Sequence, residues 1–204
     1  MFVKVCGLTT VDDVAVAVEA GADAIGVVIN RTSPRAVTPD LARSIIAAAD
    51  GAVETVLVVN DMPAEDAARL AGRIGATVLQ LHGAYTAADF AAARALFPRL
   101  WRATSLAHDP DLTVGAYGEQ VLLLDAPQPG SGRQWDLGAL ADTAPSGDWI
   151  LAGGLRPDNV ARAIAQARPW GVDVSSGVES SPGVKDHGKI REFLSSATAV
   201  TNLT

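Results

Sequence analysis

The chain of 204 residues has few of the residue types that metal centres, disulfides and nucleic-acid surfaces require. It contains one cysteine, Cys6, which excludes an intramolecular disulfide and a thiolate-rich metal site, and its three histidines show no metal-ligand spacing. Sixteen basic residues stand against 23 acidic ones, and the absence of a basic cluster argues against nucleic acid or an anionic membrane as a partner. No apolar run reaches the roughly 18 residues that span a bilayer, and the start lacks a signal-peptide pattern. We therefore expect a cytoplasmic protein that needs no metal or other cofactor.

Short apolar runs alternate with helical patterns along the whole chain. Expected strands cover residues 2–5, 24–29, 53–59, 77–81, 100–103, 121–125, 149–152 and 171–174. Expected helices cover residues 11–19, 39–50, 63–74, 86–97, 136–142, 156–168 and 186–198, with one short helix at most in 108–118 and a loop over 175–185.

Eight strand-helix units of about 25 residues each are near the lower length limit of a (β/α)8 barrel. A doubly wound open sheet is the alternative, but no Gly-x-Gly-x-x-Gly pattern follows the first strand. With 49% hydrophobic residues and no linker, the sequence predicts one TIM-barrel domain over residues 1–204.

Two side chains are predicted at the carboxyl ends of strands, where barrel enzymes keep their chemistry. Asp125 follows the apolar run Leu122-Leu123-Leu124, and near apolar walls its carboxyl could have a raised pKa and donate a proton. Cys6 ends the first strand and could act as a base or nucleophile. The alternative roles are a loop brace for Asp125 and an inert core position for Cys6.

Glycine-rich exits after the seventh and eighth strands are the most specific pattern in the chain. Gly153 and Gly154 follow one strand, and Ser175, Ser176 and Gly177 follow the other. In (β/α)8 barrels these two loops commonly bind phosphate through backbone N–H groups. The alternative is that both are only tight turns.

Three further polar residues are candidates for substrate binding. Arg35, after Ser33-Pro34, could clamp a substrate carboxylate or be plain surface. Asp173 lies inside an apolar strand, where an unpaired carboxylate is costly, so it needs a partner or a substrate hydroxyl. His82 could position substrate or satisfy a loop carbonyl.

The chain resembles the phosphoribosylanthranilate isomerase family along nearly its whole length. Six blocks in matching order carry the resemblance: Lys4-Val5-Cys6-Gly7-Leu8, Ser33-Pro34-Arg35, Gln80-Leu81-His82-Gly83, Leu124-Asp125, Leu151-Ala152-Gly153-Gly154-Leu155, and residues 171–179 with 182–186.

This resemblance implies a metal-free Amadori rearrangement of the small molecule N-(5-phosphoribosyl)anthranilate in tryptophan biosynthesis. It implies that Asp125 is the general acid on the ribose ring oxygen and Cys6 the base at ribose C2. It assigns Arg35 to the anthranilate carboxylate, Gln80, His82 and Asp173 to substrate, and the two glycine-rich loops to phosphate. A thiol of ordinary pKa ~8.5 would need a modest downward shift to serve near neutral pH.

Two stretches depart from the usual family pattern, Ile29-Asn30-Arg31-Thr32 and Pro129-Gly130-Ser131-Gly132, and both border the aromatic end of the substrate. One alternative substrate is therefore the related aminoaldose of histidine biosynthesis. The isomerases of that pathway use a pair of Asp residues as acid and base, whereas the first strand of this chain ends in Cys6. Another alternative is a non-catalytic ligand-binding relative. The sequence is compatible with a monomer or a homodimer, and it leaves the direction of Lys4 relative to Cys6 open.

Overall fold

The computed structural model describes residues 1–108, 110–126, 137–140 and 145–199. Eight parallel strands form a closed barrel in chain order, with β8 pairing to β1 through Lys4 opposite Asp173. Their bounds are β1 Phe2–Cys6, β2 Ala24–Val28, β3 Glu54–Val59, β4 Val78–His82, β5 Leu100–Ser105, β6 Val121–Asp125, β7 Trp149–Leu151 and β8 Gly171–Val174. Closure confirms the predicted barrel and excludes the open sheet.

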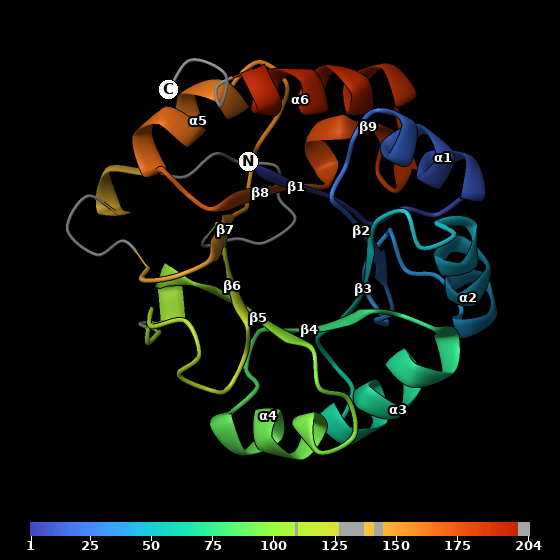
Figure 1. Ribbon diagram of the computed structural model, residues 1–204, viewed down its shortest axis with the longest axis vertical. Helices are drawn as coiled ribbons and strands as arrows, with labels where there is room; N and C mark the ends of the chain where they lie inside the picture. The colour runs from blue at the N-terminus through green and yellow to red at the C-terminus, as the bar shows by residue number, and fades with distance from the viewer. Residues whose placement is uncertain (109, 127–136, 141–144, 200–204) are drawn as a thin grey trace.

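Six α-helices of the described residues surround the barrel (Figure 1). They are α1 Val11–Glu19, α2 Pro39–Ala48, α3 Ala64–Ile74, α4 Ala87–Arg94, α5 Val160–Ala167 and α6 His187–Ala199. Thr10 and Thr86 each begin a helix with a capping box, in which the side chain of the third helical residue, an Asp, returns the hydrogen bond. In the described part of the chain, no helix is long and apolar enough to cross a membrane.

The eight strand-helix units are not all regular: in the described residues no α-helix follows β5 or β6, and after β5 this agrees with the expectation of one short helix at most. After β5 the described residues contain only a 3-10 turn, Leu106–His108, and after β6 only Leu137–Leu140. In place of a helix, a buried polar contact covers the outer face of β5: Arg102 donates to Glu119 at 2.7 Å and lies over the Tyr117 ring. The predicted helix over 136–142 lies partly outside the described residues.

The predicted loop over 175–185 contains more structure than expected. Ser176–Val178 forms a 3-10 turn, and the antiparallel strands β9 Glu179–Ser181 and β10 Val184–Lys185 form a small hairpin. Gly183 has a positive φ of 81°, and a Cβ there would overlap the carbonyl oxygen of Pro34. The missing side chain therefore lets the hairpin pack on the loop that carries Arg35.

Two apolar clusters fill the protein, one between strands and helices and one inside the barrel. Residues such as Val56, Val78, Trp101 and Ile150 fill the barrel interior, so the interior is a packed core. Because side chains alternate along a strand, Lys4 and Cys6 share the inward face of β1. The ion pair of Lys4 with Asp173 shows this direction, which the sequence left open.

Candidate active site

A cavity of about 700 Å³ opens at the carboxyl ends of the strands. Eight of the predicted site residues line it together: Cys6, Arg35, Gln80, His82, Asp125, Asp173, Ser175 and Ser176. They come from the strand ends of β1, β4, β6 and β8 and from the loops that follow β2 and β8. The barrel thus brings segments that are distant in the sequence into one pocket, as the predicted (β/α)8 fold requires.

Cys6 lies beside an ion pair whose lysine is fully buried. Lys4 Nζ is 2.9 Å from Asp173 Oδ1, and the Lys4 side chain is 0% exposed. Burial lowers the pKa of Lys4, but the charges of Asp173 and Cys6 outweigh it and the pKa lies above its ordinary value. Lys4 is therefore a fixed cation at the base of the cavity.

Burial is the main influence on the pKa of Cys6. Burial raises the pKa of the Cys6 thiol, the Lys4 charge lowers it, and the Asp173 charge raises it again, with a net upward shift. The modest downward shift that the mechanism would need is absent, because burial disfavours the thiolate more than Lys4 favours it. The resting side chain is a neutral thiol at neutral pH.

Gly26 in β2 makes room for this group. A Cβ at Gly26 would stand 2.8 Å from Cys6 Sγ and 3.3 Å from Lys4 Cε. No site role was predicted for Gly26 from the sequence, although a glycine inside a strand often marks the close approach of another group.

Asp125 has the properties of a proton donor. Burial raises the pKa of Asp125 to about 6, although a hydrogen bond from the Ala126 N–H at 2.7 Å lowers it. Near neutral pH a measurable fraction of this carboxyl is therefore protonated. The prediction of a raised pKa at this strand end is confirmed.

His82 lies beside Asp125 but is not its ion-pair partner. Its Nε2 is 3.9 Å from Asp125 Oδ2, which is too long for a hydrogen bond. Burial lowers the pKa of His82 to about 4, and the Lys4 charge contributes to this lowering, so the ring is neutral at neutral pH. A neutral imidazole at the cavity wall can donate and accept hydrogen bonds.

Gln80 carries an orphaned acceptor. The residue is 2% exposed and lines the cavity, and within the described part of the chain its Oε1 has no hydrogen-bond partner. An unpaired buried carbonyl oxygen costs free energy. A ligand hydroxyl or N–H in the cavity would satisfy it.

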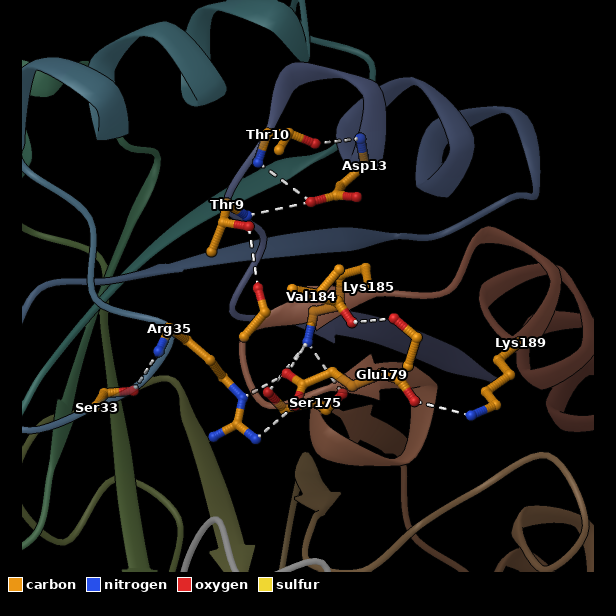
Figure 2. A network of polar contacts seen from close by, with 12 residues as sticks. Thr9, Thr10, Asp13, Ser33, Arg35, Ser175, Glu179, Val184, Lys185 and Lys189 are labelled. Atoms are coloured by element: carbon orange, nitrogen blue, oxygen red, sulfur yellow. Dashed lines mark hydrogen bonds and ion pairs between the residues drawn. The ribbon is translucent and has the colours of Figure 1, made fainter.

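Arg35 is buried and already holds a carboxylate. Its Nε and Nη2 donate to the two oxygens of Glu179 at 2.6 and 2.9 Å, and Lys185 Nζ donates to the same carboxylate at 2.9 Å. Figure 2 shows the three side chains converging beside Ser175. No role was predicted for Glu179 or Lys185 from the sequence, because only the folded barrel brings them to Arg35.

The two predicted phosphate loops contribute unequally to the cavity lining. Ser175 and Ser176 line the cavity, whereas Gly153, Gly154 and Gly177 are outside its lining residues. Gly153 has a φ of 87°, and a Cβ there would stand 2.8 Å from Asp125 Oδ1. A Cβ at Gly177 would overlap the Leu155 carbonyl oxygen, so Gly177 packs one exit loop against the other.

Comparison with known proteins adds a separate finding. The family model of N-(5'-phosphoribosyl)anthranilate isomerase matches residues 3–196, a range that includes every residue described at the cavity. The chain belongs to this family.

Individual family members are similar over almost the full length. The N-(5'-phosphoribosyl)anthranilate isomerase of Geobacter sp. (strain M21) is 42% identical over 96% of this chain and 97% of its own. The crystal structure of TrpF from Jonesia denitrificans has a TM-score of 0.92 and 57% identity, covering 98% of both chains. A family member in complex with reduced 1-(o-carboxyphenylamino)-1-deoxyribulose 5-phosphate has a TM-score of 0.85 and 31% identity, covering 98% of this chain and 99% of that one.

Proposed function

We propose that the single (β/α)8 domain isomerises N-(5-phosphoribosyl)anthranilate to 1-(2-carboxyphenylamino)-1-deoxyribulose 5-phosphate, with Asp125 as general acid and Cys6 as general base. The observation that carries these roles is one cavity walled by a carboxyl of pKa about 6 and a thiol beside a buried ammonium. The family membership supports the substrate, and the complex described for one relative supports a phosphate-bearing, carboxyphenyl ligand.

The first step opens the ribose ring. Asp125 donates its proton to the ring oxygen, the C1–O bond breaks, and the nitrogen lone pair forms a C1=N iminium. Raising the pKa of this carboxyl towards neutrality keeps some of it protonated for the transfer.

The second step uses Cys6. The iminium acidifies the C2 proton, the Cys6 thiolate removes it, and the released electron pair forms the C1=C2 bond and neutralises the nitrogen. The enolamine then becomes the ketone as C1 gains a proton and the C2 hydroxyl loses one. Lys4 stabilises the thiolate that this step requires, since its charge lowers the thiol pKa.

The resting proton positions set a condition on this mechanism. The pKa of Asp125 lies below that of Cys6, so the form that prevails near neutral pH has an ionised carboxyl and a neutral thiol. The productive form carries the same number of protons with the positions exchanged, and it is the minor one. Catalysis therefore proceeds through reversed protonation of the two groups.

The other cavity residues bind substrate in this proposal. Arg35 faces the anthranilate carboxylate, Gln80 and His82 bind ribose hydroxyls or the ring, and Ser175 and Ser176 lie where the phosphate loop was predicted. Asp173 acts through Lys4, because its carboxylate is already engaged there. All these groups come from one chain.

The test follows the loss of anthranilate-type fluorescence when purified protein meets freshly generated phosphoribosylanthranilate. Cys6→Ser and Asp125→Asn should each lose most turnover while substrate affinity changes little, because both groups act mainly in the transition state. Near-normal turnover by either folded variant would refute that residue's role.

A parallel assay with the aminoaldose of histidine biosynthesis separates the alternatives. Turnover of phosphoribosylanthranilate alone is the expected result. Turnover of both substrates would indicate a relaxed aromatic pocket, and turnover of neither would favour a ligand-binding protein.

A further inference from the structure

The cluster around Arg35 has an unusual charge balance. Two cations, Arg35 and Lys185, share the single carboxylate of Glu179, and the side chains of Arg35, Lys185 and Glu179 are 11%, 0% and 5% exposed. A buried cation is costly unless it is paired. The cluster therefore has one positive charge more than its own residues balance, at the wall of the cavity.

The contacts of Glu179 fix which edge of the guanidinium is occupied. Glu179 accepts hydrogen bonds from Nε and Nη2, which form the side edge of the forked guanidinium group. Among the residues that the structure describes, none accepts a hydrogen bond from the end of the fork, which Nη1 and the second hydrogen of Nη2 form. An arginine offers five N–H donors, so both edges can hold a carboxylate at once.

Lys185 and a glycine hold this arrangement in place. Lys185 Nζ donates to the Ser175 carbonyl oxygen at 3.0 Å as well as to Glu179. Gly7 has a φ of 72°, and a Cβ there would stand 2.6 Å from Arg35 Cδ. Lys185 thus holds the Glu179 carboxylate in place (Figure 2). The Arg35 side chain packs against Gly7, in the loop that follows β1.

We propose that Glu179 is a positioning residue that grips the side edge of Arg35 and so aims the free end of its guanidinium at the carboxylate of the substrate. The inference rests on the proposed function, which supplies that carboxylate. The substrate anion completes the charge balance that the cluster lacks. Glu179 stays ionised in this position. Burial alone would raise its pKa, but the bonds from Arg35 and Lys185 outweigh burial and keep the pKa below its ordinary range.

The experiment compares two ligands by calorimetry: reduced 1-(2-carboxyphenylamino)-1-deoxyribulose 5-phosphate and the same compound with phenyl in place of carboxyphenyl. A well-placed charged hydrogen-bond pair contributes roughly 1.5–3 kcal/mol, so the unsubstituted protein should prefer the carboxylated ligand by at least about tenfold. Glu179→Gln should lose most of that preference. In turnover, the same variant should raise KM more than it lowers kcat.

Two further variants keep the test sharp. Glu179→Asp retains the charge but is one methylene shorter, so it cannot hold both nitrogens and should also lose preference. Glu192→Gln removes the same charge from an exposed position of α6 and should keep the full preference. Because the preference is a ratio of two affinities measured on one protein, partial unfolding of a variant does not alter it.

The outcomes separate this inference from the proposed function. If the unsubstituted protein binds neither ligand, both are overturned. If it prefers the carboxylated ligand and Glu179→Gln keeps or strengthens that preference, only the positioning role is overturned, because Glu179 would then be a competitor for Arg35.

Discussion

Replacing Gly26 by alanine tests where the sulfur of Cys6 has to be. Gly26 does not have a positive φ, so the backbone of β2 accepts alanine. The new Cβ would stand 2.8 Å from Cys6 Sγ, whereas ordinary contact begins at 3.4 Å. Sγ must therefore move by at least about 0.6 Å or rotate to another position.

This displacement should be costly for catalysis and mild for folding. A misplacement of about 1 Å can cost 10²-fold in rate, so we expect kcat to fall about ten- to hundredfold. Lys4 Cε and the backbone Cα of Cys6, each 3.3 Å from the new Cβ, have to shift by a few tenths of an ångström as well. Substrate affinity should change little, because the step proposed for Cys6 follows binding.

The assay is steady-state fluorescence on folded protein, with the thermal midpoint as the measure of folding. Gly72→Ala is the matched control, because Gly72 is exposed in α3 and nothing lies within 4 Å of its added Cβ. This control should keep full activity and gain about 0.4–1 kcal/mol of stability. A folded Gly26→Ala protein with unchanged kcat would refute the positional argument.

Three other predictions concern the same cavity. With rising pH, kcat/KM should increase through an apparent pKa of about 6, because below this pH Asp125 and Cys6 are both protonated and no thiolate exists. It should decrease above the ordinary thiol range, where neither group keeps a proton. A kcat/KM that does not change around pH 6 would contradict reversed protonation. Gln80→Leu should raise KM while denaturant unfolding shows little change or a small gain, since an orphaned acceptor is removed; lower stability with unchanged KM would contradict a substrate contact. Lys4→Met should raise the pKa of the Cys6 thiol even if Asp173 takes up a proton, and the pH dependence of alkylation measures this cleanly because the chain has one cysteine.

Much of the barrel could be predicted because its signals are local. Runs such as Leu122-Leu123-Leu124 are apolar on both faces, as strands buried on both sides require. Helix starts at Thr10 and Thr86 follow from the chemistry of capping. The strand that contains Arg102 could be predicted, but the segment that covers its outer face could not. That segment binds the strand through the Arg102–Glu119 ion pair, which produces no apolar periodicity in the sequence.

For the candidate site too, only part of the arrangement could be predicted from the sequence. Cys6 and Asp125 could be placed at the barrel mouth from strand ends alone. The upward shift of the thiol pKa could not be predicted because it depends first on burial in the closed barrel and then on the distant Asp173. The occupancy of Arg35 could not be predicted because it depends on a residue far along the chain. Glu179 is 144 residues from Arg35, and Asp173 is 169 residues from Lys4. Only closure of the barrel shows which charges face each other.

The ion pair between Lys4 and Asp173 also has a consequence for synthesis on the ribosome. Lys4 emerges 169 residues before Asp173, and Arg35 emerges 144 residues before Glu179. Contacts of such high sequence separation form slowly, because a long loop has to be closed before they contribute. Until β8 is made, Lys4 lacks its counter-ion and Arg35 lacks the carboxylate that binds it. The pocket described above therefore cannot form before the last strand closes the barrel.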